Sequence, residues 1–133
     1  MAIKILLADD HKIVRDGLRA LLERESDMEV MAEASDGREA VDLARELRPD
    51  VVIMDVGMPQ LNGIEATKEL IQALPSTKVL ALSMHSNKWF TARMFGAGAS
   101  GYVQKDCAFD ELVAAIRVVA NGQTYISPNL SKY

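Results

Sequence analysis

Short apolar runs alternate with helix-like segments along the chain, and this alternation restricts the possible folds more than any other feature. The runs are mostly apolar at successive positions, as expected of parallel strands that helices cover on both faces. Because crossovers between parallel strands are right-handed, the pattern favours a doubly wound α/β sheet. The five runs are Ile3–Ala8, about Val30–Ala34, Val51–Met54, Val79–Leu82 and Gly101–Gln104.

Apolar residues spaced three and four positions apart predict helices between and after these runs. Asp36 and Glu39 are typical of a capping box before one helix, and Pro49 predicts its end. A further helix is expected over residues 88–97, and Asn121–Gly122 predicts the end of the last one. The apolar stripes are Val14, Leu18, Leu21 and Leu22; Ala40, Val41, Ala44 and Leu47; Ile64, Thr67, Leu70, Ile71 and Leu74; and Leu112, Val113, Ile116 and Val119.

A length of 133 residues, with 49% hydrophobic and 26% charged residues, is typical of one ordinary globular domain. We expect the domain to span residues 1–122, and residues 123–133, which contain Pro, Ser and Asn, to form a linker-like tail. No apolar run approaches the roughly 20 residues that cross a bilayer, so no membrane association is expected. A net charge of −4 argues against nucleic-acid binding by this chain alone, and the single cysteine predicts a cytoplasmic location.

Side chains that can bind metal or phosphate stand at the ends of four of the five runs. Asp9 and Asp10 follow the first run, Asp55 follows the third, and Ser83 and Lys105 follow the last two. The carboxyl ends of parallel strands meet at one edge of a sheet, where ligands bind. Carboxylate oxygens are the ligands that Mg²⁺ prefers, whereas an ammonium and a hydroxyl suit a phosphoryl group. A single aspartate here would more often cap a helix, but the pair together with Asp55 favours a metal site.

Together these residues resemble the receiver domain of two-component response regulators, over essentially residues 2–122. The DxxMPxxNG segment that begins at Asp55 is highly specific to that family. The resemblance, and not the periodicity, implies a flavodoxin-like fold whose five-stranded parallel sheet has the order 2-1-3-4-5, with helices on both faces. The matched residues are Asp9, Asp10, Asp55, Met58, Pro59, Asn62, Gly63, Ser83, Tyr102 and Lys105.

The resemblance also implies a chemical role for each acidic residue. Asp55 would accept a phosphoryl group from a histidine kinase. Asp10, Asp55 and the backbone carbonyl of Gly57 would bind Mg²⁺, and Asp9 would act directly or through a water molecule. The metal would stabilise charge on the transferring group, so positioning and electrostatics would supply most of the catalysis.

Three other residues receive roles by the same resemblance. Lys105 would contact the phosphoryl group, Ser83 would follow it after transfer, and Tyr102 would change rotamer as part of the switch. A domain of this kind is a phosphoacceptor in signalling and not an enzyme with a separate substrate, although it would promote its own phosphorylation and dephosphorylation.

Two positions depart from the family pattern. Asp106 follows the lysine where the family often has proline, so no cis peptide is expected there. Gly57, two residues after the acceptor, has no side chain to shield or orient water. His85, two residues after Ser83, could modulate dephosphorylation, and it fits an ordinary loop histidine equally well. The lifetime of the aspartyl-phosphate therefore stays open.

Three segments are similar to the NarL/FixJ, or LuxR-type, subgroup of response regulators: LLADDHKIVRDGLRALL, GASGYVQK and GQTYISP. Receivers of that subgroup precede a helix-turn-helix domain, which is absent from this chain. The resemblance implies transcription regulation through that domain, with a homodimer that forms on phosphorylation. The tail favours a truncated regulator over a stand-alone receiver.

Other functions fit the sequence less well. A haloacid-dehalogenase-like phosphatase would require a second acid at the position of Gly57, and a dinucleotide-binding domain would require a glycine fingerprint after the first strand. A receiver that acts as a phosphorylation-independent interaction module stays open as the alternative, although all five of the expected site residues are present.

Overall fold

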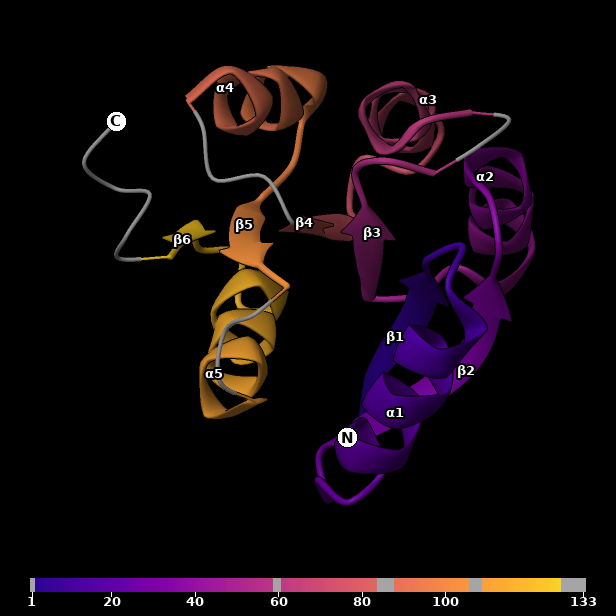
Figure 1. Ribbon diagram of the computed structural model, residues 1–133, viewed down its shortest axis with the longest axis vertical. Helices are drawn as coiled ribbons and strands as arrows, with labels where there is room; N and C mark the ends of the chain where they lie inside the picture. Colours follow the sequence, from indigo (N-terminus) through magenta and orange to yellow (C-terminus); the bar gives the residue numbers. More distant parts are fainter. Residues whose placement is uncertain (1, 59–60, 84–87, 106–108, 128–133) are drawn as a thin grey trace.

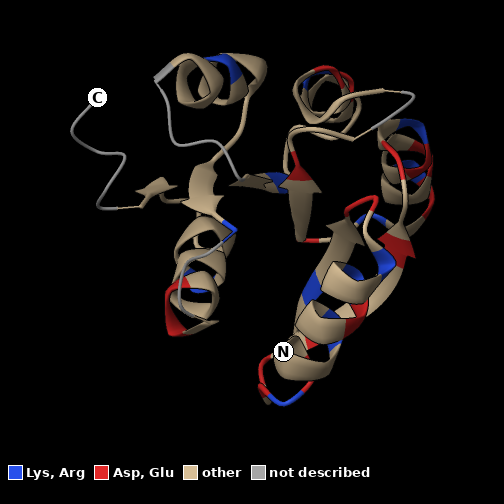
Figure 2. Ribbon diagram, viewed as in Figure 1, with Lys and Arg blue, Asp and Glu red and all other residues tan. Residues whose placement is uncertain are grey.

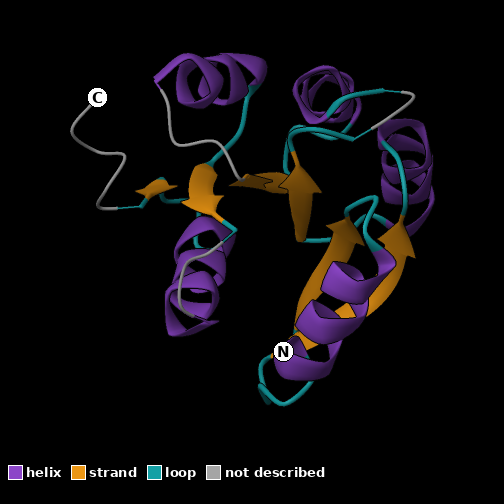
Figure 3. Ribbon diagram, viewed as in Figure 1, coloured by secondary structure: helices purple, strands orange, loops and turns teal. Residues whose placement is uncertain are grey.

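The computed structural model describes residues 2–58, 61–83, 88–105 and 109–127. It shows a parallel sheet with helices packed on both faces (Figures 1 and 3). The strands are β1 Ile3–Ala8, β2 Met28–Ala34, β3 Val51–Asp55, β4 Lys78–Ser83, β5 Gly101–Gln104 and β6 Tyr125–Ile126. The helices are α1 Lys12–Leu22, α2 Gly37–Leu47, α3 Gly63–Ala73, α4 Lys88–Ala97 and α5 Phe109–Ala120.

The strand order is β2-β1-β3-β4-β5-β6, which confirms the predicted order of the first five strands. The expectation of five strands was wrong, because the segment predicted as tail begins with a sixth. In this strand Tyr125 is in register with Gly101, and Ile126 with Tyr102. A two-residue strand has too few positions to show an alternating pattern, so nothing in the local sequence marked it.

Hydrogen bonds to α5 also hold this last strand. The hydroxyls of Tyr125 and Ser127 both donate to Oε1 of Glu111, at 3.2 and 2.8 Å. The backbone N–H of Ser127 donates to the carbonyl of Tyr102 at 3.0 Å. The chain beyond α5 is therefore joined directly to β5, the strand that carries Tyr102.

Alternate residues of the central strands point into two hydrophobic cores. In β1, Leu6 belongs to the core beneath α2, α3 and α4, whereas Ile5 belongs to the core beneath α1 and α5. Figure 1 shows α3 and α4 on one side of the sheet and α5 on the other. Burial on both faces explains why the central strands are almost continuously apolar.

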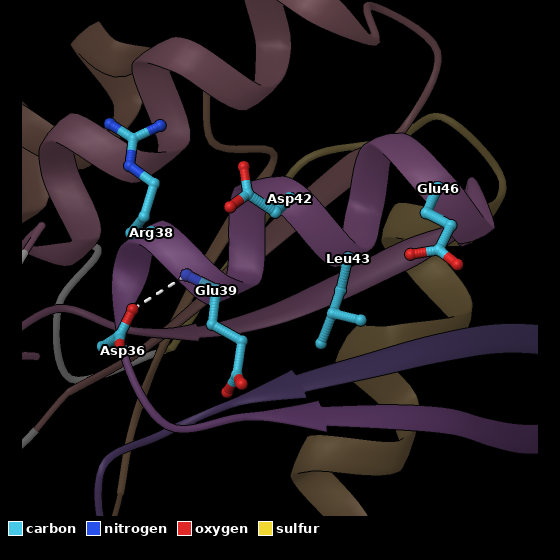
Figure 4. Close-up of a pocket in the computed structure, with 6 residues that line it drawn as sticks. All are labelled: Asp36, Arg38, Glu39, Asp42, Leu43 and Glu46. Carbon is cyan, nitrogen blue, oxygen red and sulfur yellow. Dashed lines mark hydrogen bonds between the residues drawn. The ribbon is translucent and has the colours of Figure 1, made fainter.

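The ends of α2 follow the predicted signals. Oδ1 of Asp36 accepts the backbone N–H of Glu39 at 2.8 Å (Figure 4), which confirms the N-cap. The Glu39 carboxylate accepts the N–H of Ser35 at 2.7 Å. At the other end, Arg48 has a φ of 52° before Pro49, whose ring disfavours a helical residue at that position.

Gly98 directly follows α4, which ends at the predicted residue 97, and has a φ of 113°. Residues with a side chain rarely adopt this conformation. A Cβ atom at this position would also lie 3.0 Å from Cγ1 of Ile71, so α4 turns closely against α3. The position therefore requires glycine both for its backbone conformation and for space.

Glu33 on β2 joins the sheet to α1 through two ion pairs. Its carboxylate lies 3.0 Å from Nε of Arg15 and 2.9 Å from Nη1 of Arg19. The hydrogen bond from Arg19 is the main cause that lowers the pKa of Glu33, and burial opposes it only in part. A lowered pKa means that the ionised carboxylate stabilises the fold, and that this stabilisation is lost as the pH falls through the lowered pKa.

We expect Glu33→Gln to reduce the free energy of unfolding by about 1–2 kcal/mol at neutral pH, since these are charged hydrogen bonds that water partly screens. Urea unfolding should show this difference in the free energy of unfolding above pH 4.5, the ordinary pKa of glutamate. The difference should become smaller in more acidic buffer. Glu29→Gln, at an exposed position of the same strand, is the control. An equal loss at acidic and neutral pH would contradict this account.

Candidate functional site

The strand order brings the predicted site residues to one edge of the sheet. Ala8 is in register with Met54, so the residues that follow β1 lie beside the end of β3. Asp55 is in register with Leu82, and Ser83 with Gln104, which adds the ends of β4 and β5. Figure 2 shows acidic residues where β1 and β3 end. The predicted juxtaposition of strand ends is thus present.

Four residues gather there with atoms that could hold a metal ion. Asp9, Asp10, His11 and Asp55 each offer one ligand atom, and these atoms lie within 4.8 Å of one another. Asp9 and Asp55 are 3% and 6% exposed, whereas Asp10 is exposed at the surface. The cluster therefore has a buried half and an open half, from which a hydrated ion can enter.

Lys105 bridges the two buried carboxylates. Its Nζ lies 3.0 Å from Oδ2 of Asp9 and 3.3 Å from Oδ2 of Asp55. The backbone places the ammonium there, because β5 ends beside β4 and the N–H of Lys105 donates to the carbonyl of Ser83 at 2.8 Å. A positive charge thus stands directly against the predicted acceptor.

The ionisable groups in this cluster shift one another's pKa values. Burial raises the pKa of Asp55 above its ordinary value, and the negative charge of Asp9 raises it further, against the opposing effect of Lys105. Burial acts in the same direction on Asp9, but hydrogen bonds from His11 and the adjacent Lys105 ammonium outweigh it and lower the pKa of Asp9. Burial tends to lower the pKa of Lys105, but the two carboxylates outweigh it and raise that pKa. Lys105 stays charged, and the cluster retains excess negative charge.

The cluster fits a hard divalent cation such as Mg²⁺. Oδ2 of Asp9 is buried, and within the described residues it has no hydrogen bond of good geometry, only the ion pair with Lys105. Carboxylate oxygens are the preferred ligands of Mg²⁺, and a cation would offset the repulsion that raises the pKa of Asp55. The coordination that the resemblance implies, with the Gly57 carbonyl included, stays a prediction.

Two glycines shape the approach to Asp55. The N–H of Gly57 donates to Oδ1 of Asp55 at 3.3 Å, and a Cβ on this exposed glycine would meet no atom within 4 Å. Residue 57 therefore places no side chain over the carboxylate. Gly63 begins α3, and a Cβ there would collide with the Asp55 carbonyl. Glycine at that position lets α3 start directly against the end of β3.

The predicted switch residues lie together next to this site. Ser83 and Tyr102 are 1% and 0% exposed. Burial raises the pKa of the Tyr102 hydroxyl, and hydrogen bonds with Ser83 and Thr91 oppose that rise. The tyrosine thus points inward and links the end of β4 to α4 through Thr91.

His85 and Asp106 lie outside the described residues. Thr91 and His11 were not predicted to belong to the site. The position of His11 directly after the acidic pair could have identified it as a site residue. Nothing in the sequence pattern of α4 distinguishes Thr91.

The first turn of α4 presents an aromatic surface. Trp89 is 54% exposed. Its ring packs edge-on against Phe90, with centroids 4.7 Å apart, and Cζ of Arg93 lies 5.0 Å from its centroid. The indole therefore reports on α4, the helix to which Tyr102 is linked.

Two of the surface hollows differ in their relation to the carboxylate cluster. One, of about 420 Å³, runs along α2, where the labelled carboxylates extend from one helix without converging (Figure 4). The other, of about 340 Å³, lies between α1 and α5 and is apolar except for Lys105 at its inner end. Of these two, only the second is lined by a residue that contacts the buried carboxylates, Lys105.

The pattern of the family described as response regulator receiver domain matches residues 5–117. The chain belongs to this family. Its fold and subgroup follow from relatives that resemble it over nearly its whole length. This receiver domain is 43% identical over 129 residues to the transcriptional regulatory protein DegU of Brevibacillus brevis, covering 97% of this chain and 55% of DegU. It is 40% identical over 130 residues to the response regulator UvrY of Escherichia coli, covering 98% of this chain and 60% of UvrY.

Solved structures agree with this assignment. A two-component response regulator of the LuxR family from Aurantimonas superposes with a TM-score of 0.95 at 42% identity, covering 99% of this chain and 94% of that one. The isolated receiver domain of RcsB from Salmonella enterica, solved with phosphomimetic BeF₃⁻, gives a TM-score of 0.90 at 26% identity, covering 99% and 98%. The chain is therefore a receiver domain of the LuxR/NarL family of response regulators.

Within the described residues, no helix is long and apolar enough to cross a membrane.

Proposed function

We propose that this receiver domain accepts a phosphoryl group on Asp55 from a histidine kinase, in a Mg²⁺-dependent reaction. The observation that carries the proposal is the placement of Asp55, buried at the end of β3 and held 3.3 Å from the Lys105 ammonium beside the acidic pair. A carboxylate so placed can act as a nucleophile, because cationic groups are ready to stabilise the charge of the incoming phosphoryl.

Each residue has a distinct part in this reaction. An oxygen of Asp55 attacks the phosphorus in line with the departing donor. Asp10, Asp55 and the Gly57 carbonyl would hold Mg²⁺ with help from Asp9, and the bound cation would neutralise charge on the phosphoryl oxygens. Lys105 supplies a second positive charge from the buried side. Because burial and Asp9 raise the pKa of Asp55, these cations also favour its ionised, nucleophilic form.

A kinase partner would need to cover the open side of the site. Ile13, in the first turn of α1, is 87% exposed. The hollow between α1 and α5 is lined by apolar side chains of both helices and by Lys105. An amphipathic helix could lay its apolar face on such a groove. This supports a protein phosphodonor that approaches along α1.

The output we propose is transcription regulation through a DNA-binding domain outside this chain, with a homodimer that forms on phosphorylation. The chain spans 55% of DegU, a transcriptional regulatory protein, and 67% of an RcsB chain whose dimers are bound to DNA. The acidic receiver itself would not contact nucleic acid, and a cytoplasmic location follows from this role.

An intact-mass measurement tests the phosphoacceptor directly. Purified protein is incubated with a small-molecule phosphodonor, with and without Mg²⁺. One added phosphoryl group that requires Mg²⁺ supports the proposal. A protein that acquires none would instead be the phosphorylation-independent interaction module.

We expect Ser83→Ala to accept the phosphoryl group at nearly the wild-type rate but to lose most of the conformational response. The hydroxyl hydrogen-bonds with Tyr102 and contacts the phosphoryl only after transfer, so its loss disconnects the two. Intact mass would measure phosphoryl uptake. Amide exchange of α4 and β5 would measure the conformational response. A variant that cannot be phosphorylated at all would assign Ser83 to the transfer step.

Trp89 should report the switch by fluorescence. Phosphodonor with Mg²⁺ should change its emission, because its helix carries Thr91, the hydrogen-bond partner of Tyr102. Thr91→Val should reduce the change while preserving phosphorylation. Unchanged emission from a protein shown by mass to be phosphorylated would remove α4 from the switch.

A further inference from the structure

His11 directly follows the acidic pair, and its imidazole turns back toward both carboxylates. It is the N-cap residue of α1, with φ −101° and ψ 106°, yet its side chain makes no capping hydrogen bond. Its Nδ1 lies 3.0 Å from Oδ1 of Asp9 and 3.1 Å from Oδ1 of Asp10. The ring is 64% exposed, so burial does not explain this orientation.

The two carboxylates determine which ring nitrogen carries the proton. A lone pair on Nδ1 would face two negatively charged oxygens and be repelled by both, so Nδ1 is the protonated nitrogen of the neutral ring. In this tautomer Nδ1–H donates to Oδ1 of Asp9, lies close to Oδ1 of Asp10, and cannot coordinate a metal. His11 is therefore placed to orient metal ligands and not to serve as one.

The two oxygens of Asp9 have separate surroundings. Oδ1 accepts from both the backbone N–H and the ring of His11, at 2.9 and 3.0 Å. Oδ2 is buried and faces Lys105 at 3.0 Å, without a hydrogen bond among the described residues. His11 thus occupies one oxygen of Asp9 and leaves the other for a cation.

We propose that His11 is a positioning residue for the divalent cation. Its Nδ1–H holds Asp9 and Asp10 so that their remaining oxygens face the metal. It also offsets the repulsion between adjacent carboxylates before the ion arrives. The inference deepens the proposed Mg²⁺ dependence and rests on it. Outer-shell partners of this kind typically contribute a factor of about 10–100 to metal affinity.

Calorimetric titration with Mg²⁺ alone tests this role in wild type, His11→Ala, His11→Asn and His11→Gln. The asparagine amide nitrogen takes nearly the position of Nδ1, whereas the glutamine amide extends to that of Nε2. We expect the Kd for Mg²⁺ to rise roughly tenfold in the alanine and glutamine variants. We expect it to return close to the wild-type value in His11→Asn. Thermal unfolding without metal confirms that each variant is folded.

Three results would overturn the role. Unchanged or tighter Mg²⁺ binding by folded His11→Ala would show that the ring does not organise the ligands. Unchanged Mg²⁺ binding by folded His11→Gln would show the same. Equal weakening in all three variants, with no recovery in asparagine, would reduce His11 to a general structural contribution. A wild-type protein that binds no Mg²⁺ is a separate result, since it would refute the metal dependence itself.

Discussion

Asp55→Asn should abolish phosphorylation while leaving the fold intact. The amide is nearly isosteric with the carboxylate but is not nucleophilic, so no mass should be added by a phosphodonor with Mg²⁺. Asp50→Asn, at the opposite end of β3 and exposed, is the matched control and should be phosphorylated normally. Equal uptake by Asp55→Asn and wild type would place the acceptor elsewhere.

The same substitution should stabilise the metal-free protein. Burial and Asp9 raise the pKa of Asp55, so ionisation destabilises the fold, and stability falls as the pH rises from the ordinary aspartate value through the raised one. Removing that charge should raise the free energy of unfolding at neutral pH by about 0.5–2 kcal/mol. Urea unfolding without Mg²⁺ would measure this increase in stability. The increase should become smaller when saturating Mg²⁺ stabilises the wild type.

Lys105→Met should have the largest destabilising effect in the site. The lysine and its two partners are 11%, 4% and 8% exposed in their side chains, so two buried carboxylates would lose their cation. Removing one partner of a buried ion pair costs about 3–5 kcal/mol, and we expect the lower end in metal-free buffer because the site opens to water. Phosphorylation should also slow by about a hundredfold, as one charge-stabilising donor is removed.

Two comparisons make the lysine prediction specific. Lys68→Met, at an exposed position of α3, should change neither stability nor phosphorylation appreciably. Asp55→Asn should stabilise Lys105→Met by more than it stabilises the wild type, because it then removes a buried charge that has lost its cation. Additive effects in the double variant would mean that Lys105 and Asp55 do not interact.

Most of the architecture could be predicted from the sequence. The N-cap at Asp36, the glycine after α4 and the apolar strands depend on residues a few positions apart, so local patterns record them. The candidate acceptor and its acidic neighbours were also predictable, because parallel strands place their carboxyl ends together.

The tertiary structure alone decided how those groups meet. Lys105 reaches both Asp9 and Asp55 because β5 pairs with β4 in one particular register. Tyr102 hydrogen-bonds with Thr91, and β6 extends the sheet, through contacts between segments that share no local pattern.

Sequence periodicity by itself determined which residues face the cores and which strand ends carry charge, because it records the environment of each short segment. It could not determine the rotamer of His11 or the division of the Asp9 oxygens between His11 and Lys105. Those depend on the balance of burial, repulsion and hydrogen bonding among groups that come together only when the sheet has formed.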